Sequence, residues 1–160
     1  MLFPVGFIVE FAKKIIKSTE EIFNTMIFME ISAGDPLTEG KEVLDCHISA
    51  MIGLTGDFSS MLAIHCPGTV GMAITGEMLG MDVEEVDADV KDTLGEIANM
   101  VAGGIKQAFA AENVRLELSI PTTVSGKSYT VSSPTKSNRV IIPFDLEQGR
   151  FFVEMKYNLT

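Results

Sequence analysis

The sequence predicts an α+β fold, with about three helices packed on one face of a mostly antiparallel sheet. Helical and extended patterns alternate in blocks along the chain. Most of the extended segments are separated by short turn sequences, which favours hairpins and an antiparallel sheet over a doubly wound parallel one. Glu21-Ile22-Phe23-Asn24 is echoed by Glu96-Ile97-Ala98-Asn99. This echo suggests a pseudo-duplication, in which two related helix-plus-strands halves share one sheet.

Composition limits the class of protein. The 160 residues are expected to form one domain, 1–160, with a substantial core. A hydrophobic content of 46% and a charged content of 21% are typical of a globular protein. The formal net charge of -10 argues against nucleic acid and anionic membranes as partners, because both attract basic surfaces. Most of the 10 methionines occupy core-periodic positions, so packing is their expected use, although methionine also suits adaptable binding surfaces.

A cytoplasmic location is expected from the N-terminal segment and the cysteines. The segment is apolar, but it lacks the basic start and the cleavage site of a signal peptide. Its uninterrupted apolar run is also too short to span a bilayer. Cys46 and Cys66 both fall in predicted buried strands, so we expect reduced thiols rather than a disulfide framework.

The first half is expected to hold a long helix, a short strand and a hairpin. Pro4 is tolerated at the start of the helix. Phe11, Ile15, Ile22 and Met26 recur at helical spacing and predict its apolar face. The expected elements are, in order, a helix at 5–26, a strand at 28–32, a turn at 33–36 and antiparallel strands at 42–54 and 58–66, joined through 55–57.

The second half is expected to repeat this plan after a short helix. Pro67-Gly68-Thr69 ends the preceding strand and caps the short helix, which Gly80 ends. Asp87 or Asp89 is the expected N-cap of the long helix that follows an acidic linker. The expected elements are, in order, a helix at 70–79, a linker at 82–89, a helix at 87–109, a strand at 114–120, then Pro121, a Gly/Ser-rich stretch at 122–128, a strand at 129–132, a loop at 133–138 and a hairpin of strands at 139–144 and 150–157 around 147–149.

The long helix divides into two faces when it is wound at about 100° per residue. Its apolar face, which must meet a core, consists of Leu94, Ile97, Val101, Ile105 and Ala108. Its polar face consists of Asp92, Glu96, Asn99, Gly103 and Lys106. A polar stripe of this kind is most often only a solvated face.

Gly103 is unusual on this face, because glycine costs about 0.5–1 kcal/mol relative to alanine in a helix interior. Two explanations are open. Either another backbone or protein approaches closely at Gly103, or Gly103 and Gly104 together allow tight packing on a neighbouring element.

Metal, nucleotide and covalent chemistry find no support in the sequence. His47 and His65 stand alone in strand segments, without nearby ligands at a usable spacing, and such histidines are mostly structural. Gly126-Lys127-Ser128 lacks the preceding glycine spacing and the following helix of a phosphate-binding loop. Neither a nucleophile elbow nor a cysteine with a candidate base close in sequence occurs. The remaining candidates are carboxylates and amides on a helix face, which suit positioning rather than covalent catalysis.

Asp92-x3-Glu96-x2-Asn99, followed by Pro121, resembles the signature of the CheC/CheX/FliY phosphatases of bacterial chemotaxis. The phrases at 78–81 and 94–99 are similar to CheX-like members in particular. Pro121 comes one residue earlier than the usual spacing in that family, a shift that loops tolerate. The chain length and the duplicated plan are also similar to that family over nearly the whole sequence.

The resemblance implies a substrate, a partner and a site. The substrate is the aspartyl phosphate of a CheY-type response regulator, against whose active site the long helix would lie. Asn99 would orient the attacking water, and Glu96 would pair with the regulator's active-site lysine. Asp92, Gly103 and Lys106 would be docking residues, although Asp92 also suits the helix start as a favourable charge. This chain would bind no cofactor, because the Mg²⁺ is expected on the regulator. A non-catalytic docking module that uses the same helix face is the alternative.

The first helix carries a degenerate second copy of the motif at Glu21 and Asn24. Lys17 stands where the resemblance leads us to expect an acid or a serine, and no proline follows at the expected distance. A single working site is typical of CheX-like members, which implies a homodimer joined through its sheets. The candidate dimer edges are 129–132 and 139–144.

Overall fold

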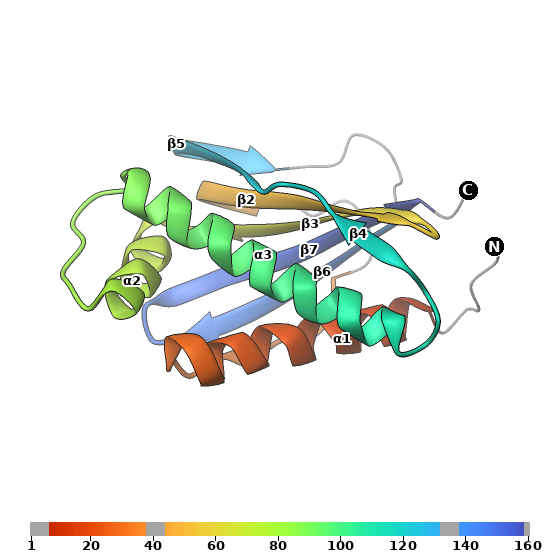
Figure 1. The fold of residues 1–160 in the computed structure, drawn as a ribbon. Coiled ribbons are helices and arrows are strands. Elements are labelled where there is room, and N and C mark those ends of the chain that lie inside the picture. The colour runs from red at the N-terminus through yellow and green to blue at the C-terminus, as the bar shows by residue number, and fades with distance from the viewer. Residues whose placement is uncertain (1–6, 38–43, 132–137, 159–160) are drawn as a thin grey trace.

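The protein is an open antiparallel sheet whose helices all lie on one face, as the computed structural model in Figure 1 shows. The structure describes residues 7–37, 44–131 and 138–158. Its elements are, in order, α1 (Phe7–Ile22), the π-helix η1 (Phe23–Ile27), β1 (Ser32–Ala33), β2 (Leu44–Gly56), β3 (Ser59–Cys66), α2 (Gly68–Leu79), α3 (Ala88–Ala110), β4 (Leu116–Leu118), β5 (Thr122–Val131), β6 (Asn138–Leu146) and β7 (Gly149–Asn158). The predicted fold class is confirmed.

The strand order shows how the two halves interlock. The seven strands run β1-β6-β7-β3-β2-β4, and β5 also pairs with β2. The hairpins β2–β3 and β6–β7 meet at the centre, where β3 pairs with β7. The short strand of each half pairs with the hairpin of the other half: Ser32 of β1 lies opposite Asp145 of β6, and Leu118 of β4 lies opposite Leu54 of β2. This exchange is the arrangement expected of two related halves that share one sheet.

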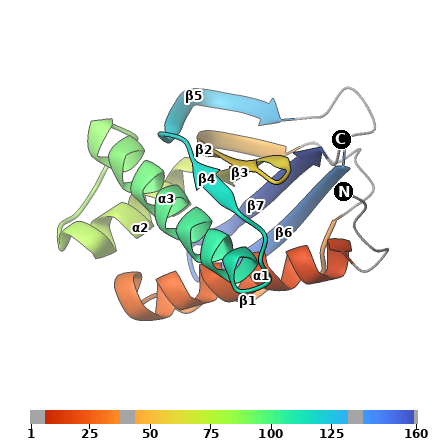
Figure 2. The ribbon, with the colours of Figure 1, turned by 45° about the vertical axis from the view of Figure 1, so that its right-hand side comes forward.

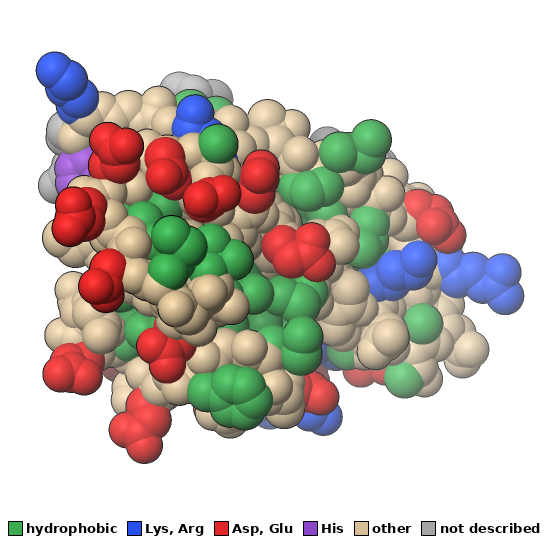
Figure 3. All heavy atoms as spheres, turned by 60° about the vertical axis from the view of Figure 1, so that its left-hand side comes forward, with side chains coloured by type: hydrophobic (Ala, Val, Ile, Leu, Met, Phe, Trp, Pro, Cys, Tyr) green, Lys and Arg blue, Asp and Glu red, His purple; other side chains and the backbone are tan. Residues whose placement is uncertain are grey.

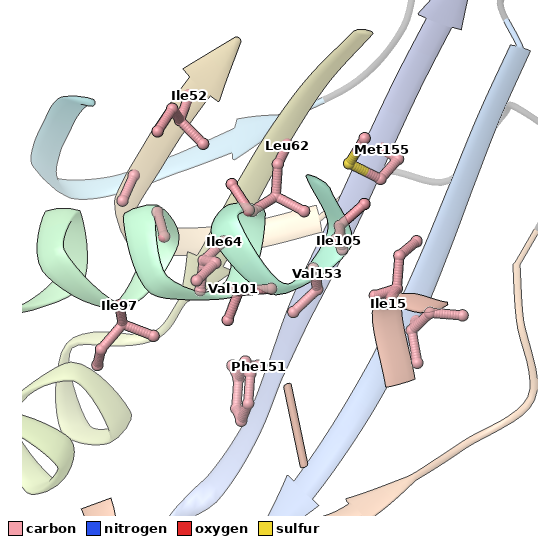
Figure 4. Packing of buried hydrophobic residues seen from close by; sticks show 14 of the residues in the cluster. Ile15, Ile52, Leu62, Ile64, Ile97, Val101, Ile105, Phe151, Val153 and Met155 are labelled. Carbon is pink, nitrogen blue, oxygen red and sulfur yellow. The ribbon is translucent and has the colours of Figure 1, made fainter. Parts of the chain in front are cut away.

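The core lies between the sheet and the helices. Alternate residues of the central strands point to this layer, because successive side chains of a strand face opposite sides. Each fully buried aliphatic side chain contributes about 1.5–3 kcal/mol of transfer free energy. Figure 4 shows α3 lying over the strands, with its buried side chains directed at theirs; the labelled residues are Ile15, Ile52, Leu62, Ile64, Ile97, Val101, Ile105, Phe151, Val153 and Met155.

Two predicted helix ends are confirmed in detail, the C-terminus of α2 and the N-terminus of α3. Gly80 ends α2 in the left-handed conformation, at φ 67°. Asp87 caps α3, since its side chain accepts hydrogen bonds from the backbone N–H groups of Asp89 and Val90. Both signals are local in sequence, which is why they could be predicted.

The apolar face predicted for the first helix is wrong at its C-terminal end. Phe11 and Ile15 are buried, but Met26 is 52% exposed. The chain changes from α-helix to π-helix at Phe23, and the wider turn rotates later residues around the axis. Phe23 and Ile27 are therefore the core residues of this turn. On α3, similarly, Ala108 is only half-buried, whereas Phe109 is buried.

The strand predicted at 28–32 is also wrong, except at its last residue. Phe28 adopts the left-handed conformation, at φ 64°, and its N–H donates to the carbonyl of Phe23 at 2.7 Å. This arrangement ends the helix, so the chain reaches the sheet only at Ser32 and Ala33.

The Gly/Ser-rich stretch after Pro121, for which no strand was predicted, belongs to a strand. β5 covers Thr122–Val131 and pairs with β2, with Thr123 opposite Ala50. Pairing with β2 supplies the backbone hydrogen bonds that the weak strand propensity of glycine and serine does not predict. In contrast, β4 is shorter than predicted. The loop predicted at 133–138 lies outside the described residues, apart from Asn138, which begins β6.

One of the two predicted dimer edges is already occupied. β6 pairs with β1, and Ile141 forms a bridge with Leu37, so the 139–144 segment is not an open edge over most of its length. β5 lies at an edge of the sheet beside β2. It contains residues 129–131 of the other candidate dimer segment, so this segment still lies at an edge of the sheet. The homodimer itself stays a prediction.

Candidate functional site

α3 is held in one orientation by close contacts on two sides. At Gly95, a Cβ atom would lie 3.5 Å from the Cγ2 atom of Thr123 and 3.9 Å from the Cβ atom of Pro121. At Gly104, a Cβ atom would collide with the side chain of Ser18 on α1. The hydroxyl of Ser18 donates a 2.7 Å hydrogen bond to the carbonyl of Val101. These contacts determine which residues of α3 face outward.

The outward face carries two carboxylates and an amide. Asp92 and Glu96 are exposed, and Asn99 is half-buried. Residues three and four apart are neighbours on a helix, so the three side chains form one row. Within the described residues, none of the three side chains takes part in a hydrogen bond or an ion pair. The polar face predicted from periodicity is therefore present, with its functional groups available to a partner.

The surroundings of Gly103 and Gly104 distinguish the two explanations given above for a glycine on the polar face of α3. Gly104 packs against α1, as the second explanation requires. A Cβ atom at Gly103, however, would meet nothing within 4 Å. Packing within the described residues therefore does not require a glycine at position 103. The remaining explanation is that another molecule approaches α3 closely at Gly103. Lys106 continues the row and lies 3.5 Å from the carboxylate of Glu117.

The connection between β4 and β5 runs alongside α3, as Figures 1 and 2 show. Pro121 in this connection is half-buried against α3 at Gly95, one residue before Glu96. Ile120, its neighbour, is 87% exposed. Sequence reasoning missed Ile120, because an isoleucine that ends a predicted strand carries no signal that it will face solvent.

The second copy of the motif has a different local geometry. Glu21 and Asn24 are both exposed, but Glu21 lies in α1 and Asn24 lies in the π-helix η1. Glu96 and Asn99 share one regular α-helix, whereas Glu21 and Asn24 span a change of helix type. Lys17 and Glu21 line the same hollow beside α1. The structure thus brings the second pair to the surface, but not in the arrangement of the first.

A buried polar cluster lies on the side of the sheet that faces away from the helices. His65 Nε2 is 2.9 Å from a carboxylate oxygen of Glu154, and Nδ1 is 2.7 Å from the hydroxyl of Ser49. Arg139 also donates to Glu154. Burial alone lowers the pKa of His65, but Cys46 and Glu154 outweigh it and hold that pKa above its ordinary value. Burial alone raises the pKa of Glu154, but His65 and Arg139 outweigh it and hold that pKa below its ordinary value.

Both histidines are thus engaged in structural contacts, as predicted. His47 accepts a 2.8 Å hydrogen bond from the backbone N–H of Gly68 at the start of α2. Among the described residues, no group of three His, Cys, Asp or Glu side chains could hold a metal ion. Cys46 and Cys66 are buried and form no disulfide. Within the same residues, no helix is both long enough and apolar enough to cross a bilayer.

The face on α3 can do limited chemistry by itself. It offers carboxylates, which attract cations, and an amide, which can hold a water molecule by donating or accepting a hydrogen bond. It offers no nucleophile and no strong base. Such a face can orient a reaction whose electrophile and metal come from another molecule.

The fold and this face define a class: signalling proteins of the CheC-like type, in which an open sheet carries a long helix with Glu-x2-Asn on its outer side. The family model described as "Chemotaxis phosphatase CheX" matches residues 48–145. The match covers more than half of the chain, and the chain belongs to the CheX family.

Individual relatives agree with this assignment. The chain is 23% identical over 120 residues to the CheY-P phosphatase CheX of Thermotoga maritima, covering 74% of this chain and 77% of that protein. A CheC-like superfamily protein from Shewanella sp. PV-4 superposes with a TM-score of 0.87 at 28% identity, over 94% of this chain and 98% of that one. The chemotaxis protein CheX from Desulfovibrio desulfuricans superposes with a TM-score of 0.85 at 28% identity, over 93% and 99%.

A more distant structure shares the fold alone. It is the CheX-CheY-BeF3-Mg²⁺ complex from Borrelia burgdorferi, with a TM-score of 0.80 at 18% identity, over 92% of this chain and 97% of that one.

Proposed function

We propose that this protein hydrolyses the aspartyl phosphate of a phosphorylated CheY-type response regulator, using the outward face of α3. The observation that carries the proposal is that Glu96 and Asn99 share the outward face of α3 and have no hydrogen-bond or ion-pair partner among the described residues. Membership of the CheX family supports it, as does the similarity to a protein named CheY-P phosphatase. In this reading residues 1–160 are one catalytic domain, as expected from the length of the chain.

Asn99 is the residue we assign to the attacking water. An acyl phosphate is already an activated electrophile, so hydrolysis needs an oriented water more than a strong base. An amide can hold that water close to an anionic phosphoryl group, where a carboxylate would be repelled. The side chain of Asn99 is half-buried and makes no hydrogen bond within the described residues. Its amide group is therefore available to bind the water molecule.

We assign Glu96 to the contact that fixes the position of the regulator along α3. An exposed carboxylate without an ion-pair partner in the described residues can accept a lysine from another molecule. A charge-assisted contact at the centre of an interface fixes orientation as well as affinity. Asp92 and Lys106 would lie toward the edges of the same contact. Gly103 would let the regulator's backbone approach the helix.

Ile120 extends the proposed docking surface beyond α3. An isoleucine with 87% of its surface exposed is costly in water but useful at an interface. It sits next to Pro121, which packs on α3 at the turn that carries Glu96. We assign Ile120 to an apolar contact with the regulator.

The metal in this proposal belongs to the substrate. The regulator would hold Mg²⁺ beside its phosphorylated aspartate, where the ion neutralises developing charge on the phosphoryl oxygens. The residues of this chain would bind no cofactor. The proposal keeps a cytoplasmic location and a homodimer as expectations.

The test is the decay of a phosphorylated CheY-type regulator with and without this protein. Catalysed decay that Asn99→Ala lowers by about 100-fold or more, with folding unchanged, is the expected result, because one oriented water accounts for the acceleration. Asn24→Ala is the matched control and should keep full activity. Acceleration that survives Asn99→Ala and is lost in Asn24→Ala would move the site to the second copy of the motif, at Glu21 of α1 and Asn24 of η1. Binding of the regulator without any acceleration would leave a docking module.

A further inference from the structure

A second surface, away from the α3 face, has the form of a docking groove. Two hollows of about 540 and 660 Å³ adjoin between the end of η1, α2 and the β6–β7 turn. They share Met29, Glu77 and Gln148 as lining residues, so they form one elongated depression. We call it the methionine groove; its apolar side chains are those of Phe28, Met29, Met72, Ala73, Met81, Val83 and Leu146. No residue of α3 lines either hollow.

The fold uses the left-handed backbone at Phe28 to end η1, but it does not need an exposed phenylalanine side chain at that position. It ends η1 in the left-handed region, where a side chain is strained and glycine is not. Gly80 ends α2 in the same region, on the other side of the groove. Phe28 is 75% exposed, so burial of its side chain within the described residues does not offset the strain. An exposed aromatic side chain at a strained position suits contact with another molecule.

The methionines of the groove are available for binding. Met29 and Met72 pack partly against the core, in line with the expected use of methionine, but within the described residues only Met155 is fully buried. Met29 and Met72 are half-buried and Met81 is 54% exposed. Methionine side chains are flexible and polarisable, so such a surface can adapt to apolar side chains of a partner.

The charge around the groove is negative. Its acidic lining residues are Glu30, Glu77, Asp82, Asp145 and Glu147. Arg150 neutralises Asp145 through contacts of 2.7 and 3.1 Å, but none of the described residues that line the groove is a lysine, arginine or histidine. The C-termini of η1 and α2 both end here without a basic residue in the last turn, so their dipoles add negative potential. Figure 3 shows hydrophobic side chains gathered on this side of the molecule, with acidic side chains around them.

We propose that the methionine groove docks a basic amphipathic helix of a partner protein. The apolar row of that helix would lie on Phe28, Met72 and Met81, and lysines or arginines on its flanks would meet Glu77, Asp82 and Glu147. Charge complementarity selects this occupant, since an apolar strip with acidic flanks matches an apolar stripe with basic flanks. The surface adds a second partner to the protein and does not use the residues assigned to phosphatase activity.

The test uses the full chain with methionine methyl groups labelled with ¹³C and a synthetic helical peptide of leucine and lysine, about five turns long. The expected result is a shift of the Met29, Met72 and Met81 methyl resonances, while those of buried Met155 and of Met61, an exposed methionine on β3, do not move. A peptide with glutamate in place of lysine should give no shift. Equal shifts at Met61, or shifts with the glutamate peptide, would overturn the proposal.

Two variants separate docking from folding. Phe28→Gly keeps the left-handed turn without strain, so it should raise the melting temperature and still weaken peptide binding at least tenfold. Glu77→Gln should weaken binding several-fold and reduce its dependence on salt. Met61→Ala is the matched control and should bind normally. Unchanged binding by Phe28→Gly would overturn the proposal.

Two other occupants are distinguished by the same variants. If Phe28→Gly raises the KM for a phosphorylated regulator, the groove belongs to the regulator interface, and the proposal of a separate partner fails. If the wild-type protein self-associates and Phe28→Gly abolishes the association, the occupant is a second copy of this chain, and the proposal fails as well. Unchanged KM and unchanged sedimentation, together with weaker peptide binding, support it.

Discussion

The hydroxyl of Ser18 on α1 donates a 2.7 Å hydrogen bond to the carbonyl of Val101 on α3. The bond lies beside Gly104, where the two helices leave no room for a side chain. It joins the two helices that carry the two copies of the motif and holds the outward face of α3 in place. One turn of α3 therefore contains two glycines with opposite surroundings, Gly104 in a tight contact and Gly103 in open space.

Substitution of these glycines by alanine should have opposite effects on stability. Gly104→Ala places a Cβ atom against Ser18 and should destabilise the protein by about 1–3 kcal/mol. Gly103→Ala meets nothing within 4 Å and should stabilise α3 by about 0.5–1 kcal/mol. For a chain of this size, that gain corresponds to a rise in melting temperature of about 1–4 °C. Thermal unfolding followed by circular dichroism measures both changes.

The same pair tests the role of Gly103 in docking. If the regulator's backbone approaches α3 there, Gly103→Ala should raise the KM for the phosphorylated regulator although the protein is more stable. A stabilised variant with an unchanged KM would show that no such close approach occurs.

Much of the fold was predictable because its signals are local. Asp87 and Gly80 cap helices through their own side-chain chemistry and backbone freedom. The row of Glu96 and Asn99 follows from helical periodicity, and that is why the candidate site could be located from the sequence.

The errors come from interactions that are distant in sequence or from unusual backbone geometry. β5 owes its existence to pairing with β2, which the Gly/Ser-rich composition of 122–128 does not reveal. The π-turn at Phe23 moved Met26 out of the core, and regular periodicity cannot anticipate it. The exposure of Ile120 depends on where the β4–β5 connection crosses α3, which no nearby residue encodes.

Removal of a core side chain from α3 should lower the free energy of unfolding without removing a residue of the candidate site. Leu94 is fully buried, at 0% exposure, two residues before Glu96. Leu94→Ala should cost about 2–5 kcal/mol, through lost burial and the cavity that remains. Asp92→Ala, on the exposed side of the same turn, is the control and should change stability by about 0.5 kcal/mol or less. Urea denaturation measures both. A loss below about 1 kcal/mol for Leu94→Ala, close to the effect of a surface substitution, would contradict the packing described for α3.

The His65–Glu154 pair should make stability depend on pH from both sides. The folded pKa of His65 is raised above 6.5, so the stability from its charged form is fully present below pH 6.5 and is lost as pH rises through the folded pKa. The folded pKa of Glu154 is lowered below 4.5, so the stability from its carboxylate is present above pH 4.5 and is lost as pH falls through the folded pKa. Stability from this pair should therefore be greatest between pH 4.5 and 6.5.

Glu154→Gln tests that dependence. Removal of one charge from the buried contacts with His65 and Arg139 should cost about 3–5 kcal/mol near pH 6 and flatten the profile above it. The matched control is Glu117→Gln, because Glu117 pairs with Lys106 at a side-chain exposure of 84% and should contribute little. Free energies of unfolding from urea titrations at several pH values give both profiles. An equally steep profile in Glu154→Gln would assign the pH dependence to other groups.

Neutralisation of Glu96 should separate binding from chemistry. Glu96→Gln keeps the shape of the exposed side chain and removes the charge proposed to meet a lysine of the regulator. The complex should weaken about 10- to 100-fold, as for loss of a charge-assisted contact of about 1.5–3 kcal/mol. Single-turnover decay at saturating protein should fall much less than in Asn99→Ala, since the water-orienting amide is intact. Glu21→Gln is the control on α1 and should leave both quantities unchanged. If Glu96→Gln binds the phosphorylated regulator as tightly as wild type, the carboxylate does not define the docking register, and the centre of the contact must lie elsewhere on α3, toward Gly103 and Lys106.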